Sequence, residues 1–169
     1  ALFAQAAPSS VLDVGCGEGV LAQRWALQLG DSGSVLGIDL EEESLQAGWA
    51  AHSAPNLSYR VVEASELPFA ENEFDMAGAI EVLEHVPEPE RTLAEMARCA
   101  REHLLVSVPR EPLWRGMNLA RGAYWPALGN TPGHLNHWSR RSFVALLSRY
   151  GEVATVRTPF PWTMLLVRL

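Results

Sequence analysis

A short buried strand that runs into a glycine-rich turn constrains this chain more than any other stretch. Segment 11–14 is apolar except for Asp13, and Gly15, Gly17 and Gly19 follow at alternate positions before a helical pattern begins. Glycines at this spacing let the backbone turn sharply and let a ligand approach without meeting a Cβ atom. A strand that feeds such a turn is how a parallel α/β sheet opens its cofactor crevice. The acid inside the strand suits a cofactor that carries an ammonium group, whereas a site for pyrophosphate alone does not need it.

Acidic residues also follow the next three strand-like segments. The second, 35–38, ends at Asp39, about 20 residues after the turn, where a ribose-binding acid is expected. A carboxylate there can accept hydrogen bonds from both ribose hydroxyls. The third segment runs into Glu63, and the fourth leads to Glu81 and the stretch 83–86, Leu-Glu-His-Val.

These four segments, in this order, resemble the class I S-adenosylmethionine-dependent methyltransferases, most closely their type 11 small-molecule branch. The likeness covers about residues 11–109 and continues beyond them as a strand–helix pattern. It implies a Rossmann-like, doubly wound, mostly parallel α/β sheet of seven strands, with S-adenosylmethionine as methyl donor and S-adenosylhomocysteine as product. The residues expected to bind the cofactor are Asp13, Gly15, Cys16, Gly17, Gly19, Asp39, Leu40, Glu63, Ala64, Ser65, Ile80 and Glu81.

The resemblance assigns the glycine turn to the methionine part of the cofactor and the second strand to its ribose. Asp13 is expected to hold the ammonium group, directly or through water, with bracing of the loop as the alternative. Asp39 is expected to bind the ribose, with an N-cap for the following helix as the alternative. Leu40 is expected to pack on the adenine.

The third and fourth strands complete the expected cofactor site. By position in the motif, Glu63 should accept a hydrogen bond from the adenine amino group, and the Ala64 amide should donate to a ring nitrogen. Family members often carry Asp at the position of Glu63. Ile80 and Glu81 should line the methyl-donor end.

The alternation of strand and helix patterns predicts a parallel, doubly wound sheet in one domain spanning 1–169, a usual length for one domain. The expected strands are 11–14, 35–38, 58–62, 74–79, 103–108, 152–158 and 162–168. The expected helices lie near 19–29, 41–52, 87–100 and 140–150. Only Pro159-Phe160-Pro161 separates the last two strands, which is too short for a parallel crossover, so the final strand should run antiparallel.

Segment 109–138 interrupts the alternation with prolines and glycines, although apolar residues recur in it at helical spacing. In class I methyltransferases an insertion after the fifth strand usually covers the substrate, so we interpret 109–138 as a lid segment. Its candidate substrate-binding residues are Trp114, Arg115, Arg121, Tyr124, Trp125 and Trp138. This mixture suits an aromatic or lipid-like acceptor that bears an acidic group, although the apolar stripe also fits core packing or a membrane surface.

A base is needed if the acceptor is a hydroxyl, because its proton must leave. The candidates are His85, His134 and His137. A structural role is the alternative for His85, and bracing of the loop is the alternative for His137. The His-x-x-His spacing resembles a metal motif, but no third ligand accompanies it in sequence, so no metal site is expected.

Charge and composition narrow the remaining choices. Residues 1–90 hold sixteen acids and two arginines, whereas 91–169 hold four acids and eleven arginines, which together give the net charge of −7. A chain this acidic is a poor general phosphate binder, so nucleic acid is not the expected partner. The arginines fit either an anionic substrate or solvated helix faces. Two cysteines are expected to be free thiols in a reducing cytoplasm.

No apolar run approaches the ~18 residues of a membrane span, and the first seven residues lack the basic start of a signal peptide. Because the first residue is not Met, we expect further residues upstream.

The sequence therefore predicts methyl transfer to a small molecule, on oxygen in preference to nitrogen or carbon. A non-catalytic S-adenosylmethionine-binding protein is the main alternative. A nicotinamide-dependent oxidoreductase is disfavoured because the third glycine comes one residue early for G-x-G-x-x-G, and because the reversed end strand does not suit that fold.

Overall fold

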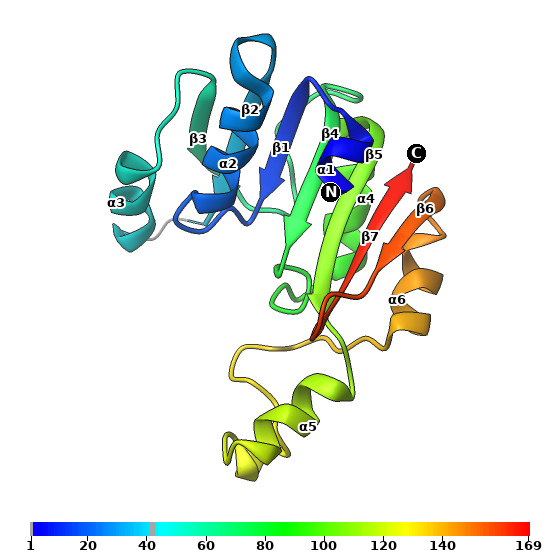
Figure 1. Ribbon diagram of the computed structural model, residues 1–169. Coiled ribbons are helices and arrows are strands. Elements are labelled where there is room, and N and C mark those ends of the chain that lie inside the picture. The colour runs from blue at the N-terminus through cyan, green and yellow to red at the C-terminus, as the bar shows by residue number, and fades with distance from the viewer. Residues whose placement is uncertain (1, 41–42) are drawn as a thin grey trace.

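The computed structural model describes residues 2–40 and 43–169, without the side chains at 43, 44 and 46. Within this part of the chain, seven strands form one sheet in the order β3-β2-β1-β4-β5-β7-β6 (Figure 1). The strands are β1 (Ser10–Val14), β2 (Ser34–Asp39), β3 (Leu57–Val61), β4 (Phe74–Ile80), β5 (Ala100–Pro109), β6 (Glu152–Arg157) and β7 (Trp162–Arg168). The strands from β3 to β5 pair in parallel, and β7 runs antiparallel to both β5 and β6. The doubly wound sheet and the reversed final strand are thus confirmed.

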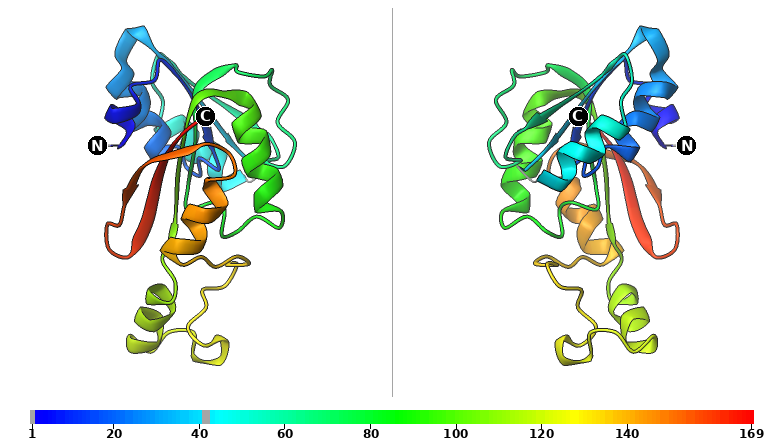
Figure 2. Two further views of the ribbon diagram at one scale, coloured as in Figure 1. Left: turned by 90° about the vertical axis from the view of Figure 1, so that its right-hand side faces the viewer. Right: turned by 90° about the vertical axis from the view of Figure 1, so that its left-hand side faces the viewer.

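Helices cover both faces of the sheet, as the edge-on views of Figure 2 show. The helices are α1 (Leu2–Ala6), α2 (Val20–Leu29), α3 (Glu43–Ala51), α4 (Pro89–Cys99), α5 (Leu113–Ala120) and α6 (Arg140–Leu147). Side chains of α1, α2 and α3 share one apolar cluster with β1 and β5, and side chains of α4 and α6 share the other. The first two residues of the expected helix 41–52 lie outside the described residues.

Strand β1 is buried on both faces, which explains its nearly continuous apolar sequence. Leu12 and Val14 pack in the cluster that contains Met96 and Phe143, whereas Val11 packs on the other face. All three apolar residues of segment 11–14 are fully buried, so the strand that carries the glycine turn is fixed by packing on both sides.

The lid segment leaves the end of β5 and projects away from the sheet before it returns to α6 (Figure 1). It contains α5 and a 3₁₀ turn, η2 (Trp125–Ala127). The buried Asn118 amide donates to the Gly129 carbonyl (2.7 Å) and to the Thr131 hydroxyl (3.1 Å), which joins α5 to the returning chain. Gly129 has a φ of +76°, and a Cβ there would collide with the carbonyl of Arg115, so this turn requires glycine.

Helix α5 continues through Gly116 despite the low helix propensity of that residue. The helix packs one side against the returning chain, and this tertiary packing outweighs the local preference. No helix in the described part of the chain combines the length and the apolar character that crossing a membrane requires.

Candidate active site

A cavity of about 710 Å³ opens at the carboxyl ends of the first four strands. This edge lies where the strand order reverses between β1 and β4, which is where open α/β sheets bind ligands. The volume lies within the range of small-molecule sites. The cavity is lined by Gly15, Gly17, Ile38, Asp39, Leu40, Val62, Glu63, Ala64, Ser65, Glu81, Val82, His85, Val86, Pro87, Glu88 and Thr92. Eight of the twelve residues expected to bind the cofactor are among them.

The glycine turn folds onto the end of β2 through Asp39. The Gly17 amide donates to one carboxylate oxygen of Asp39 (2.7 Å), and the Leu40 amide donates to the other (2.8 Å). Gly15 has a φ of +70°, and a Cβ there would collide with the Val82 side chain. Each oxygen of Asp39 retains a lone pair for a ligand hydroxyl, because a carboxylate offers about four acceptor positions.

Asp13 lies beneath the turn, with 2% of its surface exposed. Its Oδ2 atom is buried and has no hydrogen-bond partner among the described residues. Burial, and secondly the charge of Asp39, raise the pKa of Asp13 to about 8. A buried carboxyl group without a partner is costly. A ligand cation beside the turn would supply the missing partner, so this residue fits the ammonium group of S-adenosylmethionine.

The structure places four of the expected residues outside the lining of this cavity: Asp13, Cys16, Gly19 and Ile80. The Cys16 thiol is buried and donates to the Gly17 carbonyl (3.7 Å), and burial raises its pKa. Gly19 lies against Tyr59, whose hydroxyl donates to the Gly19 carbonyl (3.3 Å). Ile80 lines a second cavity of about 480 Å³ that is formed with α1 and α2. In this structure Cys16 and Gly19 shape the turn, and Ile80 packs among side chains of α1, α2 and β5 instead of lining the cofactor cavity.

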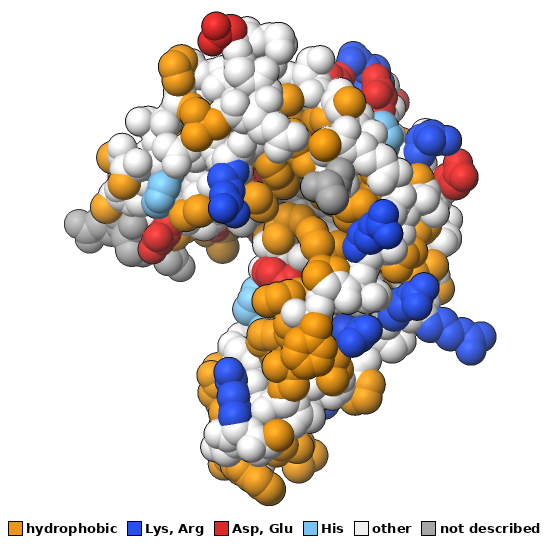
Figure 3. All heavy atoms as spheres, viewed as in Figure 1, with side chains coloured by type: hydrophobic (Ala, Val, Ile, Leu, Met, Phe, Trp, Pro, Cys, Tyr) orange, Lys and Arg blue, Asp and Glu red, His pale blue; other side chains and the backbone are white. Residues whose placement is uncertain are grey.

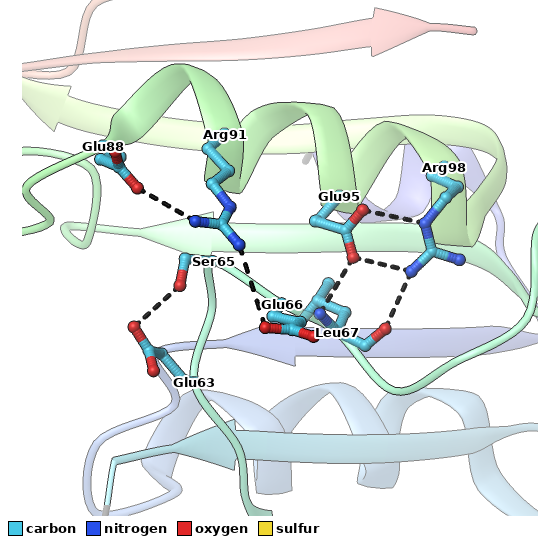
Figure 4. A network of polar contacts seen from close by, with 8 residues as sticks. All are labelled: Glu63, Ser65, Glu66, Leu67, Glu88, Arg91, Glu95 and Arg98. Carbon is cyan, nitrogen blue, oxygen red and sulfur yellow. Dashed lines mark hydrogen bonds and ion pairs between the residues drawn. The ribbon is translucent and has the colours of Figure 1, made fainter.

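The loop after β3 is attached to α4 by the polar network in Figure 4. Arg98 donates to the carbonyl of Leu67 (2.8 Å) and pairs with Glu95 (2.7 Å), which in turn accepts from the Leu67 amide (3.0 Å). Nearer the cavity, the Ser65 hydroxyl donates to the Glu63 carboxylate (2.8 Å). Helix α4 therefore fixes the position of the loop that carries Glu63.

Two carboxyl groups, those of Glu81 and Glu84, follow β4, and Glu81 lines the cavity. Glu81 has a φ of +62°, which is unusual for a residue other than glycine and is found preferentially at functional sites. The Ser107 hydroxyl donates to its carboxylate (2.6 Å), and burial raises its pKa. Glu84 is 2% exposed, and burial together with the charge of Glu81 raises its pKa to about 8.

The three candidate bases occupy different environments. His85 lines the cavity, and its Nδ1 lies 3.0 Å from the Gly133 carbonyl oxygen. His134 is buried with its ring edge-on to His85, 4.8 Å between centroids, and burial lowers its pKa to about 4. His137 accepts a hydrogen bond from the Arg115 guanidinium (2.9 Å), so it connects the end of the lid segment to α5.

The six candidate substrate residues of the lid segment line neither of the two cavities. Trp138 packs against Phe143 (5.6 Å between centroids) and contributes to the core rather than to the lid surface, because the chain has already returned to the sheet there. Trp114 stacks beside His134, and Arg115 pairs with Glu111. Arg121, Tyr124 and Trp125 are exposed. In the space-filling view, hydrophobic side chains gather on the projecting lid segment (Figure 3). A substrate role for them stays a prediction.

Comparison with known proteins identifies the family of this chain. A family model described as a methyltransferase domain matches residues 12–105, which include β1, the glycine turn and β4. The chain belongs to the methyltransferase-domain family. A curated relative from Chromobacterium violaceum, named ubiquinone biosynthesis O-methyltransferase, is 32% identical over 169 residues, with 88% of this chain and 69% of the relative covered. A relative of the same name from Thiobacillus denitrificans is 39% identical over 98 residues, which cover 56% of this chain and 41% of the relative.

The methyltransferase domain described here spans only about two fifths of the length of several curated relatives that it matches. Solved structures agree on the fold. A methyltransferase from Aquifex aeolicus has a TM-score of 0.74 and 20% identity, with 95% of this chain and 81% of that chain covered. Magnesium protoporphyrin IX methyltransferase from Synechocystis, solved with bound SAH, has a TM-score of 0.68 and 20% identity, with coverage of 94% and 73%. The cofactor of this family is S-adenosylmethionine.

Proposed function

We propose that this chain transfers a methyl group from S-adenosylmethionine to a hydroxyl oxygen of a small aromatic acceptor. The observation that carries the proposal is the buried, unpartnered carboxyl group of Asp13 beneath the glycine turn, next to a cavity that Asp39 and Glu63 line. In this proposal Asp13 faces the ammonium cation of the cofactor, Asp39 its ribose and Glu63 its adenine. The family match and the names of the curated relatives support the same reaction class.

Four groups of the chain would hold the cofactor. Asp13 would accept a hydrogen bond from its ammonium group, Asp39 from its ribose hydroxyls and Glu63 from its adenine amino group, while the Ala64 amide would donate to the adenine ring. The cofactor supplies a methyl group that is already activated by the sulfonium. The chain must therefore mainly align donor and acceptor and exclude water, which can supply most of the rate.

The acceptor proton needs a destination if the nucleophile is a hydroxyl. Among the described residues, the cavity wall offers Glu81 and His85 as proton acceptors. Burial raises the pKa of Glu81, which makes its carboxylate a stronger proton acceptor than an exposed one. The relatives named for ubiquinone biosynthesis favour a phenolic, quinone-type acceptor, and Arg121 in the lid segment would face an acidic group on it.

The proposal is tested by incubating the chain with methyl-labelled S-adenosylmethionine and a set of small acceptors. The set contains a catechol, a hydroquinone, an aromatic amine and an activated carbon acid, each with and without a carboxyl group. We expect label on the phenolic oxygen, located by NMR, and no label with the Asp39→Ala variant. Label on nitrogen or carbon alone would overturn the choice of oxygen. Tight cofactor binding without any transfer would favour the non-catalytic alternative.

A further inference from the structure

Two segments that are far apart in the sequence bring three metal-ligating side chains together. Glu84 and His85 follow β4, and His134 lies at the end of the lid segment. One ligand atom from each of the three lies within 4.8 Å of the other two. We propose that Glu84, His85 and His134 form a binding site for a divalent transition-metal cation. The sequence did not predict this site because no third ligand lies near His134 and His137 in the sequence.

The two segments are held in register by backbone hydrogen bonds. The amides of Leu135 and Asn136 both donate to the Glu84 carbonyl, at 2.7 and 3.1 Å. The Asn136 side chain donates to the carbonyls of Leu83 (3.0 Å) and Val86 (2.7 Å). The relative position of the three side chains is therefore set by the body of the molecule and does not depend on the tip of the lid segment.

The free atoms of the cluster are those that a metal needs. With Nδ1 of His85 donating to the Gly133 carbonyl (3.0 Å), Nε2 remains as a ligand, and this outer contact is usual for metal-binding histidines. The Oε2 atom of Glu84 is buried and has no partner within the described part of the chain. His134 is 8% exposed, so its ring is enclosed beside the other two groups. A cation would satisfy the buried carboxylate that the protein leaves unpaired.

The ligand set indicates the kind of cation. Two imidazoles and one carboxylate form the usual protein ligands of catalytic zinc sites, which keep a further position open. The same set with open positions binds other first-row divalent metals. His85 also lines the large cavity, so the open position would face the space proposed for the acceptor. In Figure 3, acidic and histidine side chains border the hollow between the body and the projecting lid segment.

A cation here would act on the acceptor oxygen, and this role, unlike the site itself, rests on the proposed function. A metal lowers the pKa of a hydroxyl that it binds and so makes loss of the proton easier. The O–H bond of the acceptor would break, with its proton passing to Glu81, and the oxygen would keep the electron pair that forms the new bond to the methyl carbon. The bond between the methyl carbon and sulfur would break, and its electron pair would stay on the sulfur of the leaving S-adenosylhomocysteine. His85, with Nε2 on the metal, would then not serve as the base.

The site is tested by titrating the metal-free protein with Co²⁺ and Zn²⁺ in the absence of cofactor and acceptor. Visible absorption follows Co²⁺, and calorimetry follows Zn²⁺. We expect one equivalent to bind, with Zn²⁺ tighter than Co²⁺, and at least tenfold weaker binding by Glu84→Gln and His134→Gln. His137→Gln is the matched control, because it alters the same loop without removing a proposed ligand. His85→Gln replaces Glu84→Gln if that variant does not fold.

The site is refuted if the wild-type chain binds neither cation, or if His134→Gln binds both as tightly as His137→Gln does. A parallel titration of the metal-free chain with S-adenosylmethionine separates the two proposals. Cofactor binding without cation binding would overturn the metal site alone. Cation binding without cofactor binding would leave the site standing and overturn the proposed methyl transfer.

Discussion

Replacing Asp13 by Asn should make the cofactor-free protein more stable at alkaline pH while it weakens cofactor binding. The carboxyl group has a pKa of about 8 in the folded protein, against 3.8 for the ordinary group. The folded state therefore holds a proton that the unfolded chain releases, and the free energy of unfolding falls as the pH rises from about 4 to about 8. Asn cannot ionise, so the free energy of unfolding of the variant does not fall with rising pH for this reason.

The size of the effect follows from the same two pKa values. One pKa unit corresponds to about 1.4 kcal/mol, so the free energy of unfolding of the wild type should fall by roughly 3–4 kcal/mol between pH 5 and pH 8 because of Asp13. Local relaxation of the protein around the ionised carboxylate reduces this loss of stability. We therefore expect the free energy of unfolding to fall by at least about 1.5 kcal/mol between pH 5 and pH 8 because of Asp13. Glu84, whose pKa is also raised to about 8, is present in both proteins and cancels in the comparison.

The assay is urea unfolding of both proteins at pH 5, 6.5 and 8, followed by tryptophan fluorescence. Asp31→Asn is the matched control, because Asp31 is exposed. The stability difference between Asp13→Asn and the wild type should move in favour of the variant as the pH rises, and the control should show no such trend. A difference that stays constant from pH 5 to pH 8 would refute the argument that Asp13 is a costly buried acid kept for a ligand. Calorimetry should also show at least tenfold weaker binding of S-adenosylmethionine to Asp13→Asn.

Three further substitutions test other parts of the account. Gly19→Ala should lower the free energy of unfolding by about 1–3 kcal/mol, because φ is +87° and the new Cβ would collide with Tyr59; an unchanged thermal transition would contradict this. Arg98→Ala should lower it by about 1–2 kcal/mol and weaken cofactor binding, because the loop after β3 loses its contacts with α4; full stability in a urea titration would count against the role of the network in Figure 4. Arg121→Ala should raise the KM for an acidic acceptor and leave that for its neutral ester unchanged; equal effects on both would exclude a charge contact.

The central sheet follows from local patterns in the sequence. Buried strands such as β1 and β4 are mostly apolar, with Asp13 and Asp75 as their only charged residues, and the turn at Gly15 and the acid at Asp39 mark the cofactor edge. The reversed final strand followed from the short connection at 159–161, since three residues cannot form a parallel crossover. Each of these features depends on residues that are neighbours in sequence, which is why they could be predicted.

Features that depend on distant contacts could not be predicted in this way. Helix α1 is too short to show a periodicity, and α5 passes through Gly116 because the returning chain packs against it. Ile80 was expected to line the methyl-donor end together with Glu81, but it packs against side chains of α1 and α2, which are distant in sequence from β4. The cluster of Glu84, His85 and His134 arises only when the lid segment returns to the loop after β4.

The central claim, that the cavity at the carboxyl ends of the strands binds S-adenosylmethionine, is tested most directly by calorimetric titration. The wild-type chain and the Asp39→Ala variant are each titrated with S-adenosylmethionine and with S-adenosylhomocysteine. The account predicts micromolar binding of both ligands to the wild type and at least tenfold weaker binding to the variant, because the ribose hydroxyls lose a charged acceptor. Equal binding by both proteins would contradict the assignment of Asp39, and no binding to a folded wild-type chain would contradict the cofactor site itself.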